Sequence, residues 1–262
     1  MYKSNIIGEI KEKNNKNQIL LKEFNSKYTL NIKDNNIDKI DLKGKNWSNK
    51  DLKELCKIEF NELKYLYLGK NNLSDINILE KLNLEKLESL KLRSNKISDI
   101  NVLSKINFKE LKYLSFYENN ILDIGVLEKV NFEKLEQLNL GKNKISDINV
   151  LEKVKCLELK KLYLEDNIIS NINVFEKVQF KKLNVLSLGE NKISDINVLE
   201  KVNFKELKEL YLHSNKISNI ELFKQNNFEK LEVLSLAQNN IDITNNESTI
   251  SYLKFKIKNC WC

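Results

Sequence analysis

The sequence predicts an α/β solenoid built from stacked copies of one strand-and-turn unit. The pattern L-x-x-L-x-[LF]-x-x-N-x-[LI] recurs with a constant spacing of 24 residues, and a fixed period in this range indicates a repeat architecture. Each copy has one apolar face that it cannot bury alone, so stacked copies share a continuous core. The eight leading leucines are Leu63, Leu87, Leu111, Leu135, Leu159, Leu183, Leu207 and Leu231.

The unit that begins at Leu183 shows what each part of the pattern predicts. Leu183, Leu186 and Leu188 alternate with other residues, which is typical of a strand with one face on the core. The segment 197–200 has the form N-x-x-E of a capping box, so we expect Asn197 to cap a short helical turn and Glu200 to reach back to it. Phe204 then closes the unit against the core.

Two columns of residues recur at fixed positions, and both are expected to be structural. An asparagine follows every strand, where its amide can satisfy backbone groups of the turning chain. An aromatic column is expected in the core, with Leu84 and Cys156 replacing phenylalanine in two units. The asparagines are Asn71, Asn95, Asn119, Asn143, Asn167, Asn191, Asn215 and Asn239, and the phenylalanines are Phe60, Phe108, Phe132, Phe180, Phe204 and Phe228.

The ends of the stack need caps, because open ends expose the core and unpaired strand edges. Residues 1–20 are polar and are expected to fray, while residues 21–62 form an N-terminal cap and an aberrant first repeat. Within that cap, residues 28–42 resemble a hairpin, Trp47 is apolar, and Ser48 caps a helix over 51–58. The eight repeats span 63–243. Residues 244–262 are expected to form a capping strand, through Ile250, Leu253, Phe255 and Ile257, and a tail.

These motifs resemble the leucine-rich repeat family and are most similar to its SDS22-like and internalin-like classes, whose units are usually shorter than 24 residues. The pattern L-x-x-L-x-L-x-x-N-x-[LI]-S-D-I carries the resemblance, which covers about 63–243. It implies a horseshoe with a parallel β-sheet on the concave face and short helical turns on the convex face. It also implies a protein ligand on the concave face.

A second period of 48 residues lies within the first, because charges alternate between neighbouring units. The residue before the leading leucine is Glu62, Lys86, Glu110, Lys134, Glu158, Lys182, Glu206 and Lys230, and the residue after it is Lys64, Glu88, Lys112, Glu136, Lys160, Asn184, Lys208 and Glu232. Adjacent strands lie about 4.8 Å apart, so opposite charges are expected to face each other. The alternation either favours the correct register or records duplication of a two-repeat block.

The outward positions of the strands hold the candidate binding residues. Tyrosines concentrate there, and exposed tyrosine suits an interface because it offers large contact area at low entropic cost, although tyrosine also simply favours strands. We expect the concave, partner-binding face to contain Tyr65, Tyr67, Lys91, Arg93, Tyr113, Tyr117, Tyr163, Glu165, Tyr211 and His213. The N-terminal end of this face is basic (with Lys70), and its middle is acidic (with Glu118, Asp166 and Glu190).

Composition makes several other classes unattractive. The chain has one histidine, His213, and no motif typical of a nucleophilic, phosphate-binding or metallohydrolase site, so we expect no catalytic residues, metal or cofactor. No apolar run suggests a signal peptide or a membrane span, so a cytoplasmic monomer without a small-molecule substrate is expected. The four cysteines are expected to be reduced, although the redox state of Cys260 and Cys262 stays open.

The sequence therefore favours a non-catalytic module, or scaffold, that binds a protein or peptide through the tyrosine-rich concave face. One alternative, resting on resemblance alone, is an SDS22-like regulatory subunit of a phosphatase. Another is a nucleic-acid or anionic-surface binder, because the net charge is +7 and lysines recur on the convex side. Those lysines adjoin carboxylates, which is more typical of a solvated face than of a phosphate-binding groove.

Overall fold

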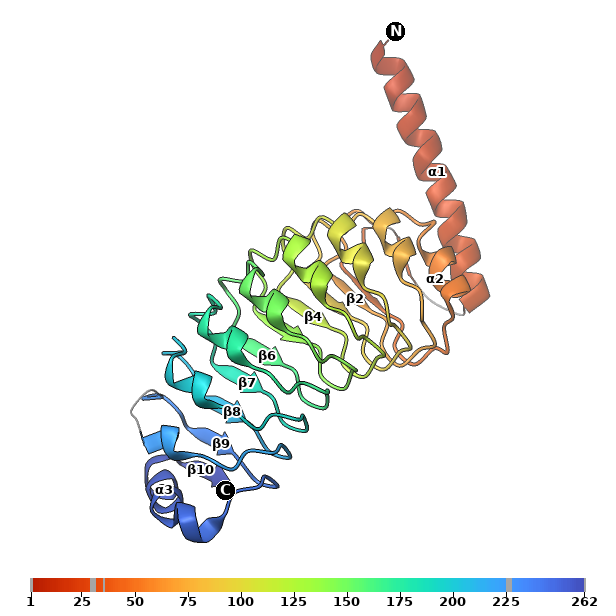
Figure 1. Ribbon diagram of the computed structural model, residues 1–262. Helices are drawn as coiled ribbons and strands as arrows, with labels where there is room; N and C mark the ends of the chain where they lie inside the picture. Colours follow the sequence, from red (N-terminus) through yellow and green to blue (C-terminus); the bar gives the residue numbers. More distant parts are fainter. Residues whose placement is uncertain (1, 29–31, 35, 225–227, 262) are drawn as a thin grey trace.

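A computed structural model describes residues 2–28, 32–34, 36–224 and 228–261. The chain forms an elongated, curved solenoid, with helix α1 projecting from one end and helix α3 closing the other (Figure 1). This confirms the predicted α/β horseshoe. None of the described helices combines the length and the apolar composition needed to cross a bilayer.

One parallel sheet of ten strands runs through the described residues, in sequence order from β1 to β10. Its register advances by one repeat per strand, so Leu66, Leu90 and Leu114 are direct neighbours. The middle residue of each repeat strand is an inward leucine, and the two residues beside it face outward. The strands are β1 (Lys39–Asp41), β2 (Tyr65–Tyr67), β3 (Ser89–Lys91), β4 (Tyr113–Ser115), β5 (Gln137–Asn139), β6 (Lys161–Tyr163), β7 (Val185–Ser187), β8 (Glu209–Tyr211), β9 (Val233–Ser235) and β10 (Asn259–Trp261).

The convex side carries short 3-10 helices: η1 (Asn77–Lys81), η2 (Asn101–Lys105), η3 (Gly125–Lys129), η4 (Asn149–Glu152), η5 (Asn173–Glu176), η6 (Asn197–Glu200) and η7 (Glu221–Lys224). The predicted capping box at 197–200 is wrong. Asn197 is the first residue of η6, and its backbone N–H donates to Asp195 Oδ1 at 2.9 Å. An aspartate two residues before the helix thus satisfies the free amide, as Asp side chains do in tight turns.

The asparagine column joins each repeat to its neighbours, as predicted. Asn119 is buried, and its Nδ2 donates to the carbonyls of Phe116 at 2.9 Å and Leu92 at 3.0 Å. Its Oδ1 accepts from the backbone N–H of Ile97 at 3.0 Å. One side chain therefore satisfies backbone groups in its own repeat and in the preceding repeat, as polar groups inside an apolar stack require.

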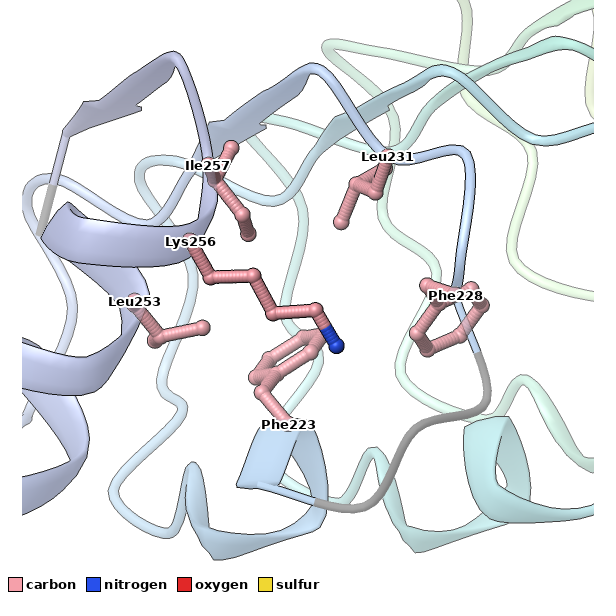
Figure 2. Close-up of a pocket in the computed structure, with 6 residues that line it drawn as sticks. All are labelled: Phe223, Phe228, Leu231, Leu253, Lys256 and Ile257. Atoms are coloured by element: carbon pink, nitrogen blue, oxygen red, sulfur yellow. The ribbon is translucent and has the colours of Figure 1, made fainter.

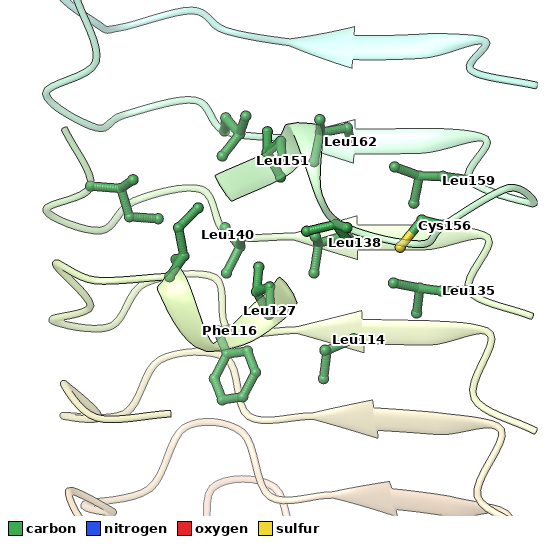
Figure 3. Packing of buried hydrophobic residues seen from close by; sticks show 14 of the residues in the cluster. Leu114, Phe116, Leu127, Leu135, Leu138, Leu140, Leu151, Cys156, Leu159 and Leu162 are labelled. Atoms are coloured by element: carbon green, nitrogen blue, oxygen red, sulfur yellow. The ribbon is translucent and has the colours of Figure 1, made fainter. Parts of the chain in front are cut away.

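The core is a set of stacked columns of identical or similar side chains. Figure 3 shows Leu114, Leu138 and Leu162 in successive strands, with Leu127 and Leu151 of the convex helices packed behind them. The predicted aromatic column is buried throughout, and Cys156 is 1% exposed in its place there. Burial raises the pKa of the Cys156 thiol to about 12, so this cysteine behaves as an apolar side chain.

The predicted charge alternation produces ion pairs between repeats. In the column before the leading leucine, each lysine pairs with the glutamate of the preceding repeat: Lys86 with Glu62 at 2.5 Å, Lys134 with Glu110 at 2.6 Å, Lys182 with Glu158 at 2.6 Å, and Lys230 with Glu206 at 2.6 Å. Exposed pairs of this kind contribute about 0.2–1 kcal/mol each. Opposite charges therefore do face each other, in blocks of two repeats.

The N-terminal cap differs from the prediction. Helix α1 spans Tyr2–Tyr28, so residues 2–20 are helical rather than frayed. The proposed hairpin over 28–42 is also wrong: Tyr28 ends the helix, residues 32–34 have no regular structure, and only Lys39–Asp41 forms a strand. Part of the first proposed strand, residues 29–31, lies outside the described residues.

Helix α1 caps the stack because one side of its second half is apolar. Leu21 and Phe24 are buried, and the ring of Phe24 lies 5.7 Å from that of Trp47. Asn17 Nδ2 donates a hydrogen bond to the Glu59 carbonyl at 3.0 Å, and Asn17 Oδ1 accepts one from the Glu59 backbone N–H at 2.9 Å. The predicted helix after Ser48 is present as α2 (Asn49–Leu55), where Asp51 accepts from the Ser48 backbone N–H at 2.8 Å.

The C-terminal cap is also a helix rather than the predicted strand. Helix α3 spans Ile243–Lys256. Asp242 caps its N-terminus, and the Asp242 side chain accepts a hydrogen bond from the backbone N–H of Thr244. Leu253 and Ile257 are buried and face Phe223, Phe228 and Leu231 of the last two repeats (Figure 2), whereas Phe255 is 93% exposed. The final strand is β10, at 259–261, which extends the sheet beside β9.

Candidate functional site

The ten predicted binding residues share the concave face, where they lie in three rows that cross the strands. The first row contains Tyr65, Ser89, Tyr113, Gln137, Lys161, Val185, Glu209 and Val233. The second row contains Tyr67, Lys91, Ser115, Asn139, Tyr163, Ser187, Tyr211 and Ser235. The third row lies two residues beyond the second and contains Gly69, Arg93, Tyr117, Gly141, Glu165, Gly189, His213 and Ala237. All six predicted tyrosines are partly or largely exposed, and Tyr113 is the most open at 42%.

At the N-terminal end of this face, cations stack on the tyrosine rings. Lys91 Nζ lies 4.6 Å from the centre of the Tyr67 ring, and Lys39 Nζ of β1 lies 5.2 Å from the same ring. Arg93 Cζ lies 5.6 Å from the Tyr117 ring. Cation–π contacts at exposed sites contribute about 0.5–1 kcal/mol, so they hold the rings while leaving charge at the surface.

In the third row, three long side chains fold over the glycine of the preceding repeat: Arg93 over Gly69, Glu165 over Gly141, and His213 over Gly189. A Cβ added to Gly69 would lie 2.8 Å from Arg93 Cγ. The same atom on Gly189 would lie 2.4 Å from His213 Cε1. A larger residue at these positions would displace the side chains that cover them, so the glycines allow Arg93 and His213 to lie where they do on the concave face.

The acidic middle of the face contains groups with shifted pKa values. Burial raises the pKa of Glu165, and the nearby negative charge of Glu190 adds to the effect. The pKa of Tyr211 rises to about 12 because of burial and because its hydroxyl donates to Glu209 Oε2 at 2.8 Å. Tyr163 has a raised pKa for the same main reason, burial. Both tyrosines are therefore neutral hydrogen-bonding groups at physiological pH.

Sequence reasoning did not single out three residues that the structure adds to this surface. Lys39 precedes the repeats, so no repeat pattern pointed to it. Glu209 was hidden because no other unit has a carboxylate there; its equivalents are tyrosine, serine, glutamine, lysine or valine. Ser89 appeared only as a small residue of an even-numbered unit, and its burial depends on the tyrosines beside it.

Four of the six lysines that recur on the convex side are paired with carboxylates. These four contact the glutamate of the preceding repeat: Lys105 with Glu80 at 3.0 Å, Lys153 with Glu128 at 3.1 Å, Lys177 with Glu152 at 3.5 Å, and Lys201 with Glu176 at 3.7 Å. Among the described residues, no three His, Cys, Asp or Glu side chains lie close enough together to hold a metal ion.

Comparison with known proteins identifies the repeats. Residues 109–153 match the family model for leucine rich repeats, in two copies. No curated protein matches the sequence. The chain is similar to the solved structure of an internalin, InlF, of Listeria monocytogenes, with 23% identity, a TM-score of 0.53, and coverage of 91% of this chain and 88% of that one. Internalin C2 of the same organism has 26% identity and a TM-score of 0.56, over 65% of this chain and 70% of that one. A leucine-rich repeat protein of Leptospira interrogans has 28% identity and a TM-score of 0.61, over 72% of this chain and 46% of that one.

Proposed function

Because the chain belongs to the leucine-rich repeat family, we propose that it is a non-catalytic module that holds a protein or peptide ligand against its concave face. The observation that carries the proposal is the set of tyrosines that the strand alternation directs away from the core. Curved solenoids present extended concave surfaces of the kind that bind other proteins. Tyrosine adds contact area, a polar tip and few rotatable bonds.

The distribution of charge supports an oriented ligand. Lys39, Lys91 and Arg93 lie at the N-terminal end of the concave face, while Glu165 and Glu209 lie in its C-terminal half. Complementary charges across an interface increase the association rate and select one orientation. A ligand with an acidic segment near β2–β4 and a basic segment near β6–β8 would match this polarity.

The surroundings of His213 support the non-catalytic part of the proposal. Its Nε2 lies 4.0 Å from Glu190 Oε1, which is a loose contact. The adjacent Ser214 hydroxyl donates to Gln238 Oε1 at 2.5 Å. A serine nucleophile would instead need to donate to the histidine and to sit beside an oxyanion-binding group. The convex ion pairs likewise favour a protein ligand over nucleic acid, because paired lysines offer little unmatched positive charge.

The test is affinity capture from native lysate with the wild-type chain and the variant Tyr65/Tyr113/Tyr163/Tyr211→Ser, followed by mass spectrometry. The four changes lie on the surface, so circular dichroism should show an unchanged fold. Leu157→Ser is the control, because Leu157 is 62% exposed on the opposite face. We expect one or more proteins to be retained by the wild type and the control and lost by the tyrosine variant. Equal recovery by all three chains would refute the concave binding face.

A further inference from the structure

Ser89 has a buried hydroxyl group near the N-terminal end of the concave face, on strand β3. The residue is 2% exposed, and its Oγ has no hydrogen-bond partner among the described residues. Its direct neighbours in the sheet are Tyr65 on one side and Tyr113 on the other. A small residue between two large ones lies at the bottom of a depression, and a buried hydroxyl without a partner calls for an explanation such as a missing ligand group.

The depression above Ser89 is large enough to receive a side chain. Its volume is about 270 Å³, and its lining includes Tyr65, Tyr67, Lys91 and Tyr113. The pocket thus has aromatic walls, the Ser89 hydroxyl at its floor and one cation at its side, and Ser115 and Gln137 add further polar groups. Binding sites for small groups are typically apolar cavities with a few convergent polar groups of this kind.

The charge at this pocket is positive. Within the described residues, no carboxylate lies within 4.0 Å of the Lys91 ammonium group. Its electrostatic contact is the cation–π contact with the face of the Tyr67 ring. Lys39, which also lies near that ring, has a loose contact with Asp41 at 3.8 Å. The neighbouring Glu88 is already paired with Lys112 at 2.8 Å. Lys91 therefore offers an unmatched positive charge.

A second buried serine on the same face shows how such a site is completed. Ser187 lies between Tyr163 and Tyr211 in the sheet, and its hydroxyl is close enough to the carboxylate of Glu165 to favour the charged form of that group. The chain therefore already places a carboxylate beside a serine that is flanked by tyrosines. At Ser89 no side chain of the protein has that role, and a lysine is in place to balance a negative charge.

We propose that the pocket above Ser89 binds an aspartate or glutamate side chain of the protein ligand. The carboxylate would accept a hydrogen bond from Ser89 and lie beside the Lys91 ammonium group, while Tyr65 and Tyr113 would pack against its stem. Hydrogen bonds that are assisted by charge are the stronger ones in proteins. The proposal rests on the function proposed above and identifies the chemistry that one part of the concave face recognises.

Selection of short random peptides displayed on phage, with the immobilised full chain as the target, tests this proposal. The targets are the wild type, Lys91→Glu, and the control Lys161→Glu, which makes the same change on the same face outside the pocket. We expect the wild type and the control to select peptides with Asp or Glu at one fixed position. Lys91→Glu should lose that preference and favour Lys or Arg there. The same acidic preference in all three, or none in the wild type, would overturn the proposal.

A binding cycle with one selected peptide then measures the contact. Lys91→Gln in the protein and the acid-to-amide change in the peptide should each weaken binding about tenfold, and together they should weaken it little further. Fully additive losses would show that the two groups do not meet. Ser89→Ala should weaken binding and yet raise Tm by about 2–4 °C, because it removes an unpaired buried group, whereas a merely structural role would lower Tm.

Two further selections separate this proposal from the more general one. If Tyr65/Tyr113/Tyr163/Tyr211→Ser loses the selected peptides but these peptides have no conserved acid, only the acidic pocket is refuted. If the tyrosine variant retains the same peptides, or if the wild type selects none, the concave binding function fails together with the pocket. Ser187→Ala is the matched control for Ser89→Ala and should keep the acidic preference.

Discussion

Lys208 pairs with Glu232 of the following repeat, with Nζ 3.4 Å from Oε1. The equivalent Lys112 pairs in the opposite direction, with Glu88 of the preceding repeat at 2.8 Å. The difference arises because Asn184 occupies the position where the repeat before Lys208 would have a glutamate. The two charge columns together join every pair of consecutive units from the first to the eighth, except the sixth and seventh, which meet at Asn184.

Asn184→Glu should therefore repair the missing step. A carboxylate there would lie between Lys160 and Lys208, and the Oδ1 atom that it replaces is buried without a partner in the described structure. We expect the free energy of unfolding to rise by about 0.2–1 kcal/mol. Urea unfolding at low salt measures the gain, which should disappear in about 1 M salt as the charges are screened. Asn184→Gln is the control, and a similar gain for both variants would show that the ion pair is not the cause.

The asparagine column should be far less tolerant of substitution. Asn119→Ala removes bonds to Leu92, Phe116 and Ile97 and leaves buried backbone groups without partners. Each such group costs about 1–3 kcal/mol, so we expect a loss of about 2–5 kcal/mol in thermal or urea unfolding. Asn120→Ala changes the next residue, which is half-exposed, and should alter stability by less than about 0.5 kcal/mol. Comparable losses for the two variants would contradict the structural role of the column.

The repeats were predictable because one period determines the strand, the turn and the direction of each side chain. Leu66 must face inward, so Tyr65 and Tyr67 must face outward, and this logic places every candidate binding residue. The caps were not predictable in the same way. Helix α1 is held by contacts between Phe24 and Trp47, residues far apart in sequence, and the Leu253 and Ile257 spacing that belongs to a helix also fits a short strand.

The contacts on the concave face were also beyond the sequence pattern. The direction of each side chain follows from the alternation of residues along a strand, but the burial of Ser89 depends on the tyrosines of two neighbouring repeats. The same holds for Gly189, whose role becomes visible only once His213 is seen to cover it. Features that depend on the conformation of long side chains need the structure, whereas features that depend on backbone register do not.

Every repeat has one residue with a left-handed backbone conformation, and none of these residues is glycine. The sequence therefore gave no sign of this conformation. This residue comes just before the conserved asparagine, and Lys70 has φ 55° there. A residue with a Cβ pays about 1 kcal/mol or more for this conformation. We therefore expect Lys70→Gly to raise the free energy of unfolding by up to about 1 kcal/mol, a gain reduced by the greater chain entropy of glycine when unfolded. Lys70→Ala should leave stability unchanged in the same urea titration, and a gain for alanine would refute the conformational cause.

Glu165 should make the stability of the protein depend on pH. Burial raises the pKa of this carboxyl group in the folded state, and the charge of Glu190 adds to the shift. The folded chain therefore holds the proton more tightly than the unfolded chain, so stability falls as pH rises through the range between the two pKa values. At pH values below the pKa that Glu165 has in the unfolded chain, its carboxyl group is neutral in both states and no longer changes the stability with pH.

Glu165→Gln should accordingly be more stable than the wild type at neutral pH and equal to it at about pH 3–4, where the wild-type carboxyl is protonated. Glutamine keeps the shape of the side chain and can still bond Ser187, so the variant removes the charge alone. Thermal unfolding across this pH range measures the difference, with Glu229→Gln as a control at an exposed position. A stabilisation that is the same at all pH values would contradict the buried charge as its cause, and a loss of stability at neutral pH would show that the carboxylate is favourably bound.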